Sequence, residues 1–304
     1  MAQKKICIRK TTSYGILFLV LCVISTFVFS FLANSMKLST KSRASTPKSN
    51  PAIIGGRTAA EGEFPYMVFM YHKDKLIYDA KTGKYDLFTN KALVCGGVVI
   101  KNSWIMTAAH CVEKIKKYES VGLAVGVTKL IGTMTQETYD KTFYSIQDIQ
   151  IHPDYASAFD VAPFDLALIQ TTAPMNVSAT PLLPSTSLED KLYAIDNSTT
   201  IAGYGIYQYV PWLWIFTSGV YPKELQTINL PIVSGPDKNP LKIGYVDEKK
   251  GRQNTSDKGD SGGPVLFTYN GTVYVIGILS DNYGPVYGPH ISSHLDWITK
   301  IIGQ

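Results

Sequence analysis

Three short segments carry residue types that together can transfer acyl groups. His110 lies in Thr-Ala-Ala-His-Cys, Asp165 opens the apolar run Asp-Leu-Ala-Leu-Ile, and Ser261 lies in Gly-Asp-Ser-Gly-Gly-Pro. A serine hydroxyl is a poor nucleophile at neutral pH, so it needs a base that removes its proton and a carboxylate that orients the base. The sequence therefore predicts a catalytic triad of His110, Asp165 and Ser261.

A second acid competes with Asp165 for the orienting role. Asp160 lies five residues earlier, in Ala-Phe-Asp-Val-Ala-Pro, where the nearby Pro163 weakens a strand assignment. We favour Asp165, because it begins the strand-like run, and keep Asp160 as the alternative.

The order His, Asp, Ser and the motifs around these residues resemble the chymotrypsin/trypsin-like serine endopeptidases. Other matching motifs follow the family order along residues 53–304, among them Ile53-Ile54-Gly55-Gly56, Cys95-Gly96-Gly97, His152-Pro153-Asp154-Tyr155 and Gly203-Tyr204-Gly205. The resemblance implies an all-β fold of two packed six-stranded antiparallel β-barrels with a C-terminal helix. The helical spacing of Leu295, Ile298, Ile301 and Ile302 predicts that helix.

The resemblance also implies roles for residues around the triad. The backbone amides of Gly259 and Ser261 correspond to those of the oxyanion hole. Cys95 and Cys111 correspond to two cysteines that form a disulfide bond in the family. Asp260 corresponds to the acid that receives the new amino group of Ile53 after cleavage. We therefore expect an inactive precursor, since a buried carboxylate without a partner is costly.

The expected activation site departs from the family pattern. Ala52, rather than Arg or Lys, precedes Ile53. An elastase-like activator, or stepwise trimming by a dipeptidyl peptidase after an earlier cut, suits this junction better than a trypsin-like enzyme.

The primary substrate pocket is predicted to be neutral. The residue at its base in the family lies six positions before the nucleophile, which here is Thr255. Ser256, Ser280 and Asn282 complete the expected substrate-binding set. We expect a shallow pocket for a medium neutral side chain, with Asp257 or Asp281 as alternative acids that would attract a basic one.

The first 52 residues differ from the rest. Tyr14 to Ala33 form an apolar stretch of twenty residues, long enough to span a bilayer, although Ala33-Asn34-Ser35 also suits a signal peptidase. We divide the chain into a basic and hydrophobic signal anchor or signal peptide at 1–34, a stem or propeptide at 35–52, and the protease domain at 53–304. A single-pass type II membrane protein is slightly favoured over a secreted one.

Charge and sequons bear on location and partners. Residues 1–52 carry eight Lys or Arg and no acid, so the remainder has 21 basic and 24 acidic residues. Its net charge of −3 gives no electrostatic case for binding nucleic acid.

Asn-x-Ser/Thr sequons at Asn176, Asn197, Asn254 and Asn270 are candidate glycosylation sites and indicate the secretory pathway. No cofactor or metal is expected, because the acids and histidines show no ligand spacing.

Two long loops leave a choice open. The charged excursion from His72 to Lys91 is either a solvated hairpin or an exosite. The aromatic loop from Ile206 to Tyr221, which contains Trp212 and Trp214, either packs on the barrel or contacts a membrane or hydrophobic substrate.

These features predict a zymogen of a serine endopeptidase that acts on protein or peptide substrates after an activating protease has cut before Ile53. The alternative is a catalytically inactive homologue that acts as a secreted binding protein. An esterase is disfavoured, because Ser261 lacks the Gly-x-Ser-x-Gly elbow.

Overall fold

The computed structural model describes residues 56–87, 89–130, 134–156, 162–177, 180–206, 208–212, 216–234, 239–244, 256–280 and 286–303. The expected leader, the stem and Ile53 lie outside these residues, as do Asp160, Asn254, Thr255, Asp281 and Asn282. Residues 50–304 form one compact unit. Within the described ranges, no helix has the length and hydrophobicity needed to cross a membrane.

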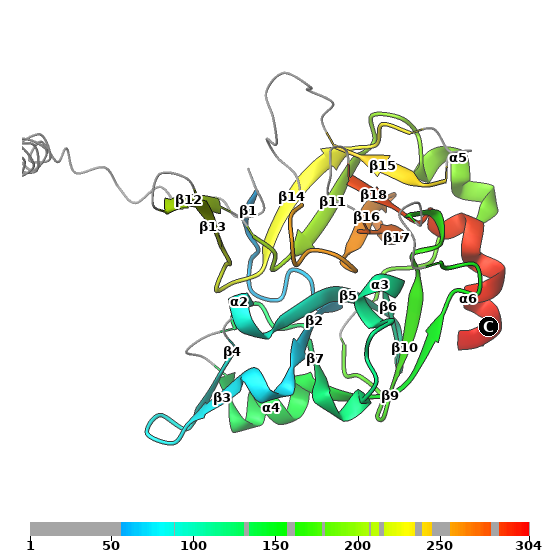
Figure 1. Cartoon of the computed structure of the whole chain (residues 1–304). Coiled ribbons are helices and arrows are strands. Elements are labelled where there is room, and N and C mark those ends of the chain that lie inside the picture. The colour runs from blue at the N-terminus through cyan, green and yellow to red at the C-terminus, as the bar shows by residue number, and fades with distance from the viewer. Residues whose placement is uncertain are drawn as a thin grey trace, which may run out of the picture. The chain divides into compact units, whose positions relative to one another are not determined.

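Six antiparallel strands close the first barrel (Figure 1). Their order around it is β10 (Ala167–Thr171), β6 (Trp104–Thr107), β5 (Leu93–Lys101), β2 (Met67–His72), β7 (Val121–Val125) and β9 (Phe143–Ile151). Strands β2 and β7 read as nearly continuous buried runs, so both faces of these strands pack against other residues. The core includes Met67, Phe69, Ile105 and Leu123, all fully buried.

The second barrel is completed by isolated bridges. Its main sheet has the order β1 (Arg57–Thr58), β14 (Gln226–Pro231), β11 (Ser198–Gly203), β16 (Pro264–Tyr269) and β17 (Thr272–Ile278). A separate pair, β15 (Leu241–Ile243) and β18 (Val286–Gly288), joins it through the bridges Ile232↔Ile243 and Gly277↔His290. The predicted all-β, two-barrel fold is therefore confirmed.

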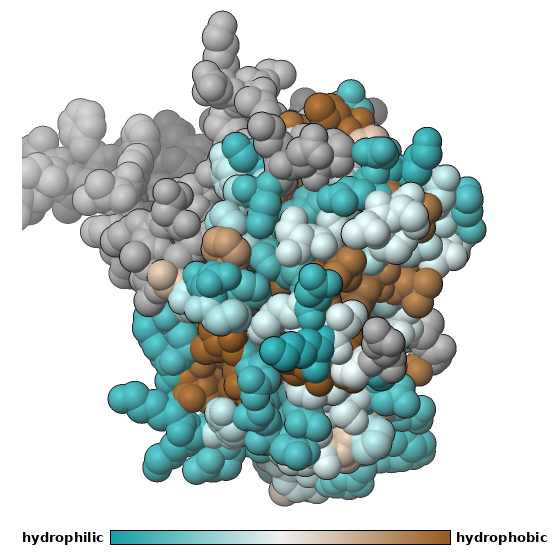
Figure 2. Space-filling model, turned by 90° about the vertical axis from the view of Figure 1, so that its right-hand side faces the viewer, coloured by the Kyte–Doolittle hydropathy of each residue, from teal (hydrophilic) through white to brown (hydrophobic). Residues whose placement is uncertain are grey.

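Short helices connect the strands and one helix ends the domain. They are α2 (Thr89–Ala92), α3 (Ala109–Val112), α4 (Gln136–Thr142), α5 (Glu189–Leu192) and α6 (Leu295–Ile302), with 3-10 turns at Lys73–Lys75, Tyr118–Ser120, Ala162–Phe164, Thr186–Leu188 and Ile291–His294. As expected from its spacing, α6 buries Ile298 and packs Leu295, Ile301 and Ile302 on the core. On the face that carries α6, hydrophobic residues lie in separate groups among hydrophilic ones (Figure 2).

The two long loops are both hairpins. Strands β3 (Leu76–Asp79) and β4 (Lys84–Leu87) pair with β8 (Met134–Thr135) in a small three-stranded sheet, and Tyr85 stacks on Tyr139 with ring centroids 4.5 Å apart. The aromatic loop forms β12 (Gln208–Trp212) and β13 (Phe216–Val220), which pair only with each other among the described strands. The tryptophan side chains on which the contact hypothesis rests lie outside the described part of the chain.

Candidate active site

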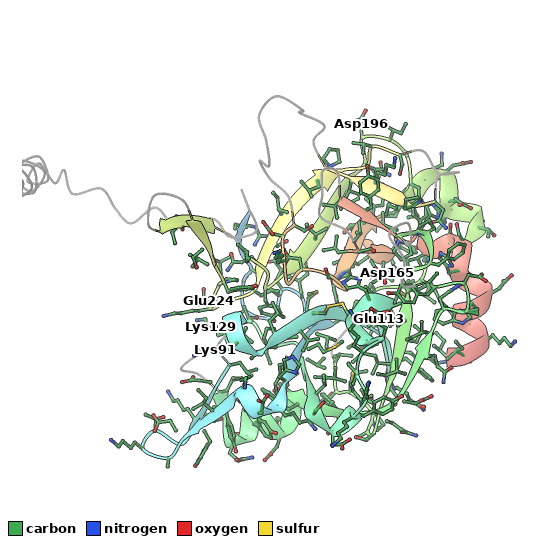
Figure 3. The ribbon with its side chains drawn as sticks, in the orientation of Figure 1. Lys91, Glu113, Lys129, Asp165, Asp196 and Glu224 are labelled. Carbon is green, nitrogen blue, oxygen red and sulfur yellow. A yellow bond between two sulfur atoms is a disulfide. The ribbon has the colours of Figure 1, made fainter. Side chains whose placement is uncertain are left out.

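Asp165 joins the two barrels at the predicted site. It lies between the 3-10 turn Ala162–Phe164 and β10, and Figure 3 shows it between the barrels. One carboxylate oxygen, Oδ1, accepts a hydrogen bond from the backbone N–H of His110 at 2.8 Å. The other, Oδ2, accepts from His110 Nδ1 at 2.6 Å and from the hydroxyl of Ser280, which follows β17 of the second barrel. The structure therefore brings Asp165 to His110.

The surroundings keep the Asp165 carboxylate ionised. Its side chain is only 1% exposed, and burial alone would raise its pKa. The hydrogen bond and charge of His110, with the hydroxyl of Ser280, outweigh this burial and hold the pKa of Asp165 below its ordinary value. A carboxylate that accepts from Nδ1 leaves Nε2 of the same imidazole free to act as a base.

His110 itself lies on the short helix α3, directly after β6. Its side chain remains 34% exposed, so the ring is accessible from solvent. The following residue, Cys111, forms a disulfide with Cys95 of β5, with the Cα atoms 6.0 Å apart, as the resemblance implied. This bond fixes the helix to the neighbouring strand.

Ser261 lies on a turn that packs against the histidine-bearing barrel. Its carbonyl oxygen accepts from the backbone N–H of Gly96 at 2.8 Å. Gly262 follows with φ +80°, and a Cβ there would lie 2.3 Å from the Thr107 hydroxyl oxygen and 2.5 Å from the Gly96 carbonyl oxygen. Only glycine fits this close approach, which places Ser261 beside α3.

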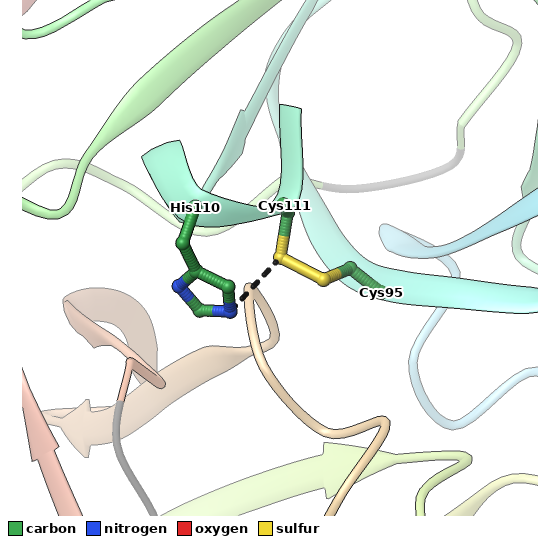
Figure 4. A group of neighbouring side chains, drawn as sticks. All are labelled: Cys95, His110 and Cys111. Carbon is green, nitrogen blue, oxygen red and sulfur yellow. Dashed lines mark hydrogen bonds between the residues drawn. A yellow bond between two sulfur atoms is a disulfide. The ribbon is translucent and has the colours of Figure 1, made fainter. Parts of the chain in front are cut away.

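Ser261 and His110, the predicted nucleophile and base, are not hydrogen-bonded to each other in this structure. Among the described residues, no hydrogen bond links the Ser261 hydroxyl to His110, and His110 Nε2 lies 3.6 Å from Sγ of Cys111 (Figure 4). The two sulfurs in Figure 4 are bonded to each other, so this group offers no thiolate to a metal. Catalytic hydrogen bonds are often long without substrate, so this geometry is compatible with a Ser-His pair.

Asp260 is a buried acid beneath the serine turn. Its side chain accepts from the backbone N–H groups of Gly205 at 2.8 Å and Asp257 at 2.9 Å. A Cβ at Gly203 would lie 2.0 Å from Asp260 Oδ1, so the Gly-Tyr-Gly motif makes room for the carboxylate. Burial raises the pKa of Asp260 to about 7, which the two backbone hydrogen bonds only partly offset.

The remaining predicted residues fall into two groups. The first group lies within the described residues: Gly259 has φ +101°, and Ser256 is buried. The second group, Thr255 and Asn282, lies outside them. The hydroxyl of Ser280, which is also one of the predicted substrate-binding residues, donates to Asp165. Sequence reasoning selected Ser280 but missed this contact, because the serine lies 115 positions from Asp165 along the chain.

A second missed residue is Thr107, which precedes the histidine helix. Its hydroxyl donates to the Gly96 carbonyl at 2.8 Å and thereby links β6 to the strand that holds the Ser261 turn. Its position in Thr-Ala-Ala-His-Cys was the available signal.

His110 is hydrogen-bonded to a buried aspartate between two β-barrels, and Ser261 lies on a glycine-rich turn packed beside it. This arrangement defines the two-barrel class of Ser-His-Asp proteins. The family model described as Trypsin matches residues 53–298, and the chain belongs to this trypsin-like serine protease family.

Curated relatives are similar over most of this chain. It is 28% identical to vitamin K-dependent protein C of Mus musculus over 276 residues, and 29% identical to that of Oryctolagus cuniculus over 279 residues; both alignments cover 84% of this chain and 53% of the relative. The chain thus spans about half the length of the curated relatives it matches.

Proposed function

We propose that this chain is a serine endopeptidase that hydrolyses peptide bonds through an acyl-enzyme. The observation that carries the proposal is the hydrogen bond between His110 Nδ1 and the buried Asp165 carboxylate, at 2.6 Å, on the partly exposed face beside Ser261. A histidine held in this tautomer presents Nε2 as a general base. The trypsin family membership supports the same chemistry.

The proposed reaction has two proton transfers at His110. Ser261 Oγ attacks the peptide carbonyl while His110 takes its proton, and His110 then gives that proton to the departing amine. Asp165 keeps the ring oriented and stabilises the imidazolium. The amides of Gly259 and Ser261 would bind the oxyanion, and one such donor typically contributes about 2.7–4 kcal/mol. Water then hydrolyses the acyl-enzyme by the same steps.

Activation by a new amino group is the second part of the proposal. Asp260 is buried and accepts hydrogen bonds from two neutral backbone N–H groups, and this burial raises its pKa to about 7. A free amino group at Ile53 would supply the missing positive charge and order the turn that holds Gly259. An activating protease would generate it by cutting after Ala52.

The remaining features define the expected setting. A protein or peptide is the substrate, and the neutral pocket residues Thr255, Ser256 and Asn282 favour a neutral side chain at the cleaved bond. The disulfide fits an oxidising compartment, so we place the domain outside the cytoplasm. Anchoring by residues 14–33 remains part of this proposal.

Active-site phosphonate labelling of two purified forms tests the proposal. One form begins at Met36 and the other at a free Ile53, and Ser261→Ala serves as the control for each. Labelling of Ser261 only in the second form is the expected result. Labelling in both would remove the activation step but keep the enzyme.

The alternative function is a binding protein without catalysis. The absence of a Ser261–His110 hydrogen bond among the described residues is the one observation in its favour. If neither form is labelled although both fold, the endopeptidase proposal is refuted and the binding protein takes its place.

A further inference from the structure

The sequon at Asn197 is built into the second barrel. Its side-chain Nδ2 donates to two backbone carbonyls at the end of α5, that of Lys191 at 2.8 Å and that of Leu192 at 3.2 Å. The last carbonyls of a helix lack partners within the helix, so these hydrogen bonds cap it. An asparagine amide has two hydrogens, and both are used here.

The hydroxyl residue of the same sequon is equally engaged. Thr199 is 0% exposed and its hydroxyl donates to the Leu230 carbonyl at 2.6 Å. Strands β11 and β14 pair at this position, so the hydroxyl lies inside the sheet interface. Both functional groups of the sequon therefore serve the fold.

The sequon at Asn270 is placed in the opposite way. Asn270 is exposed at the turn between β16 and β17, with φ +49°, and Gly271 follows with φ +78°. Two successive residues with positive φ are typical of a tight hairpin turn, which Asn-Gly favours. A Cβ placed on Gly271 would meet no atom within 4 Å, so the space around the turn is open.

We propose that Asn270 carries an N-linked oligosaccharide, whereas Asn197 is a helix-capping residue that stays unmodified in the folded protein. This rests on the proposed passage through the secretory pathway. In the transfer, Asn270 Nδ2 forms a bond to C1 of the sugar, the bond from C1 to the pyrophosphate of a lipid-linked oligosaccharide breaks, and Nδ2 loses a proton.

The same transfer is incompatible with the role of Asn197. A substituted Nδ2 retains one hydrogen, so at most one of the two capping hydrogen bonds could remain. The sugar would also start from an atom held against Lys191 and Leu192. Chains modified at Asn197 are expected to fold less well and to be depleted from the folded product.

Peptide mapping tests the two assignments directly. The full chain is produced in a eukaryotic cell line, the folded protein is purified, and peptide N-glycosidase in heavy-oxygen water marks each occupied asparagine. Modified Asn270 with unmodified Asn197 is the expected result. Occupancy at Asn197 overturns the cap, and an unmodified Asn270 overturns the acceptor assignment. Phosphonate labelling of Ser261 is read separately, so neither outcome is confused with failure of the enzyme proposal.

A stability measurement on carbohydrate-free protein isolates the capping role. The unit from residue 50 onward holds the described core, so a bacterial chain from Met36 is suitable. Asn197→Asp removes both donors and is expected to lower Tm by about 4–8 °C, whereas the matched change Asn270→Asp leaves Tm unchanged, because Asp tolerates positive φ. Equal Tm values for the two variants would overturn the capping role.

Discussion

Two buried histidines near the active site predict a specific loss of stability in acid. His294 Nδ1 lies 3.2 Å from His152 Nε2, and the two side chains are only 4% and 6% exposed. The backbone N–H of Asp154 donates to His152 Nδ1, so His152 carries its proton on Nε2 and donates to His294. The rings of Phe164 and Trp297 pack beside them. The pair therefore fits the neutral form of both imidazoles.

The magnitude follows from the pKa of His294. Burial first, and then the neighbouring His152, lower this pKa from 6.5 to about 4, against weaker opposing effects of the Pro163 carbonyl and Asp154. Below pH 6.5 the unfolded chain binds a proton that the folded chain excludes. The stabilisation is therefore fully present above pH 6.5 and falls as the pH drops towards 4, by about 1.4 kcal/mol per pH unit and about 3 kcal/mol in total.

Replacing His294 with phenylalanine separates this effect from packing. The ring contacts are retained, but the donor on His152 loses its acceptor, which costs about 1–2 kcal/mol at pH 7. The variant lacks the acid-sensitive group, so its free energy of unfolding should decrease less with falling pH. We expect the curves of the parent and His294→Phe to meet between about pH 5 and 6.

Urea unfolding followed by tryptophan fluorescence, at steps between pH 7 and 4.5, measures both curves. His72→Gln is the matched control, because His72 is exposed and its replacement should leave the slope unchanged. If the parent and His294→Phe curves stay parallel over this range, the pKa of His294 is the same in the folded and unfolded states, and the reasoning is refuted.

Three further predictions concern the site. Ser280→Ala should lower kcat/KM about tenfold and raise the pKa of Asp165, because it removes a hydrogen bond to the carboxylate. Ser280→Thr keeps the hydroxyl and should change neither quantity. An unchanged pH profile of kcat/KM in the alanine variant would contradict this prediction. Gly262→Ala should lower the free energy of unfolding in urea by about 3 kcal/mol or more. Gly271→Ala is the control, because it has open space at a similar φ, and should cost about 1 kcal/mol. Equal losses would show that the close contact of Gly262 with Thr107 and Gly96 is unimportant. Because the pKa of Asp260 is raised, its own contribution to precursor stability falls as the pH rises from about 4 to 7, opposite in sign to the contribution of His294. Asp260→Asn should remove the Asp260 contribution and prevent the gain in labelling at a free Ile53. Parent and variant stability curves that run parallel over this pH range would refute it.

Much of the fold and the candidate site could be predicted from short motifs. The runs around His110, Asp165 and Ser261 indicated the two-barrel fold and the family, and the structure brings His110 to Asp165. The pairing of Cys95 with Cys111 also followed from the resemblance. These predictions succeed because each motif combines a reactive residue with the local backbone it requires.

Contacts between distant segments could not be predicted in the same way. Ser280 reaches Asp165 from 115 positions away along the chain, and His294 reaches His152 from 142 positions away. The four sequons match the same sequence pattern, yet Asn197 caps a helix and Asn270 lies in an open turn.

The sequence by itself determined which residues could do chemistry, because nucleophile, base and acid are recognised by type and immediate context. The tertiary structure alone decided which polar groups were already used, which acids and histidines lost water, and which asparagine remained exposed. The physical reason is that hydrogen bonding and desolvation depend on what lies within a few ångströms in space, and barrel closure brings together residues that are far apart in the chain.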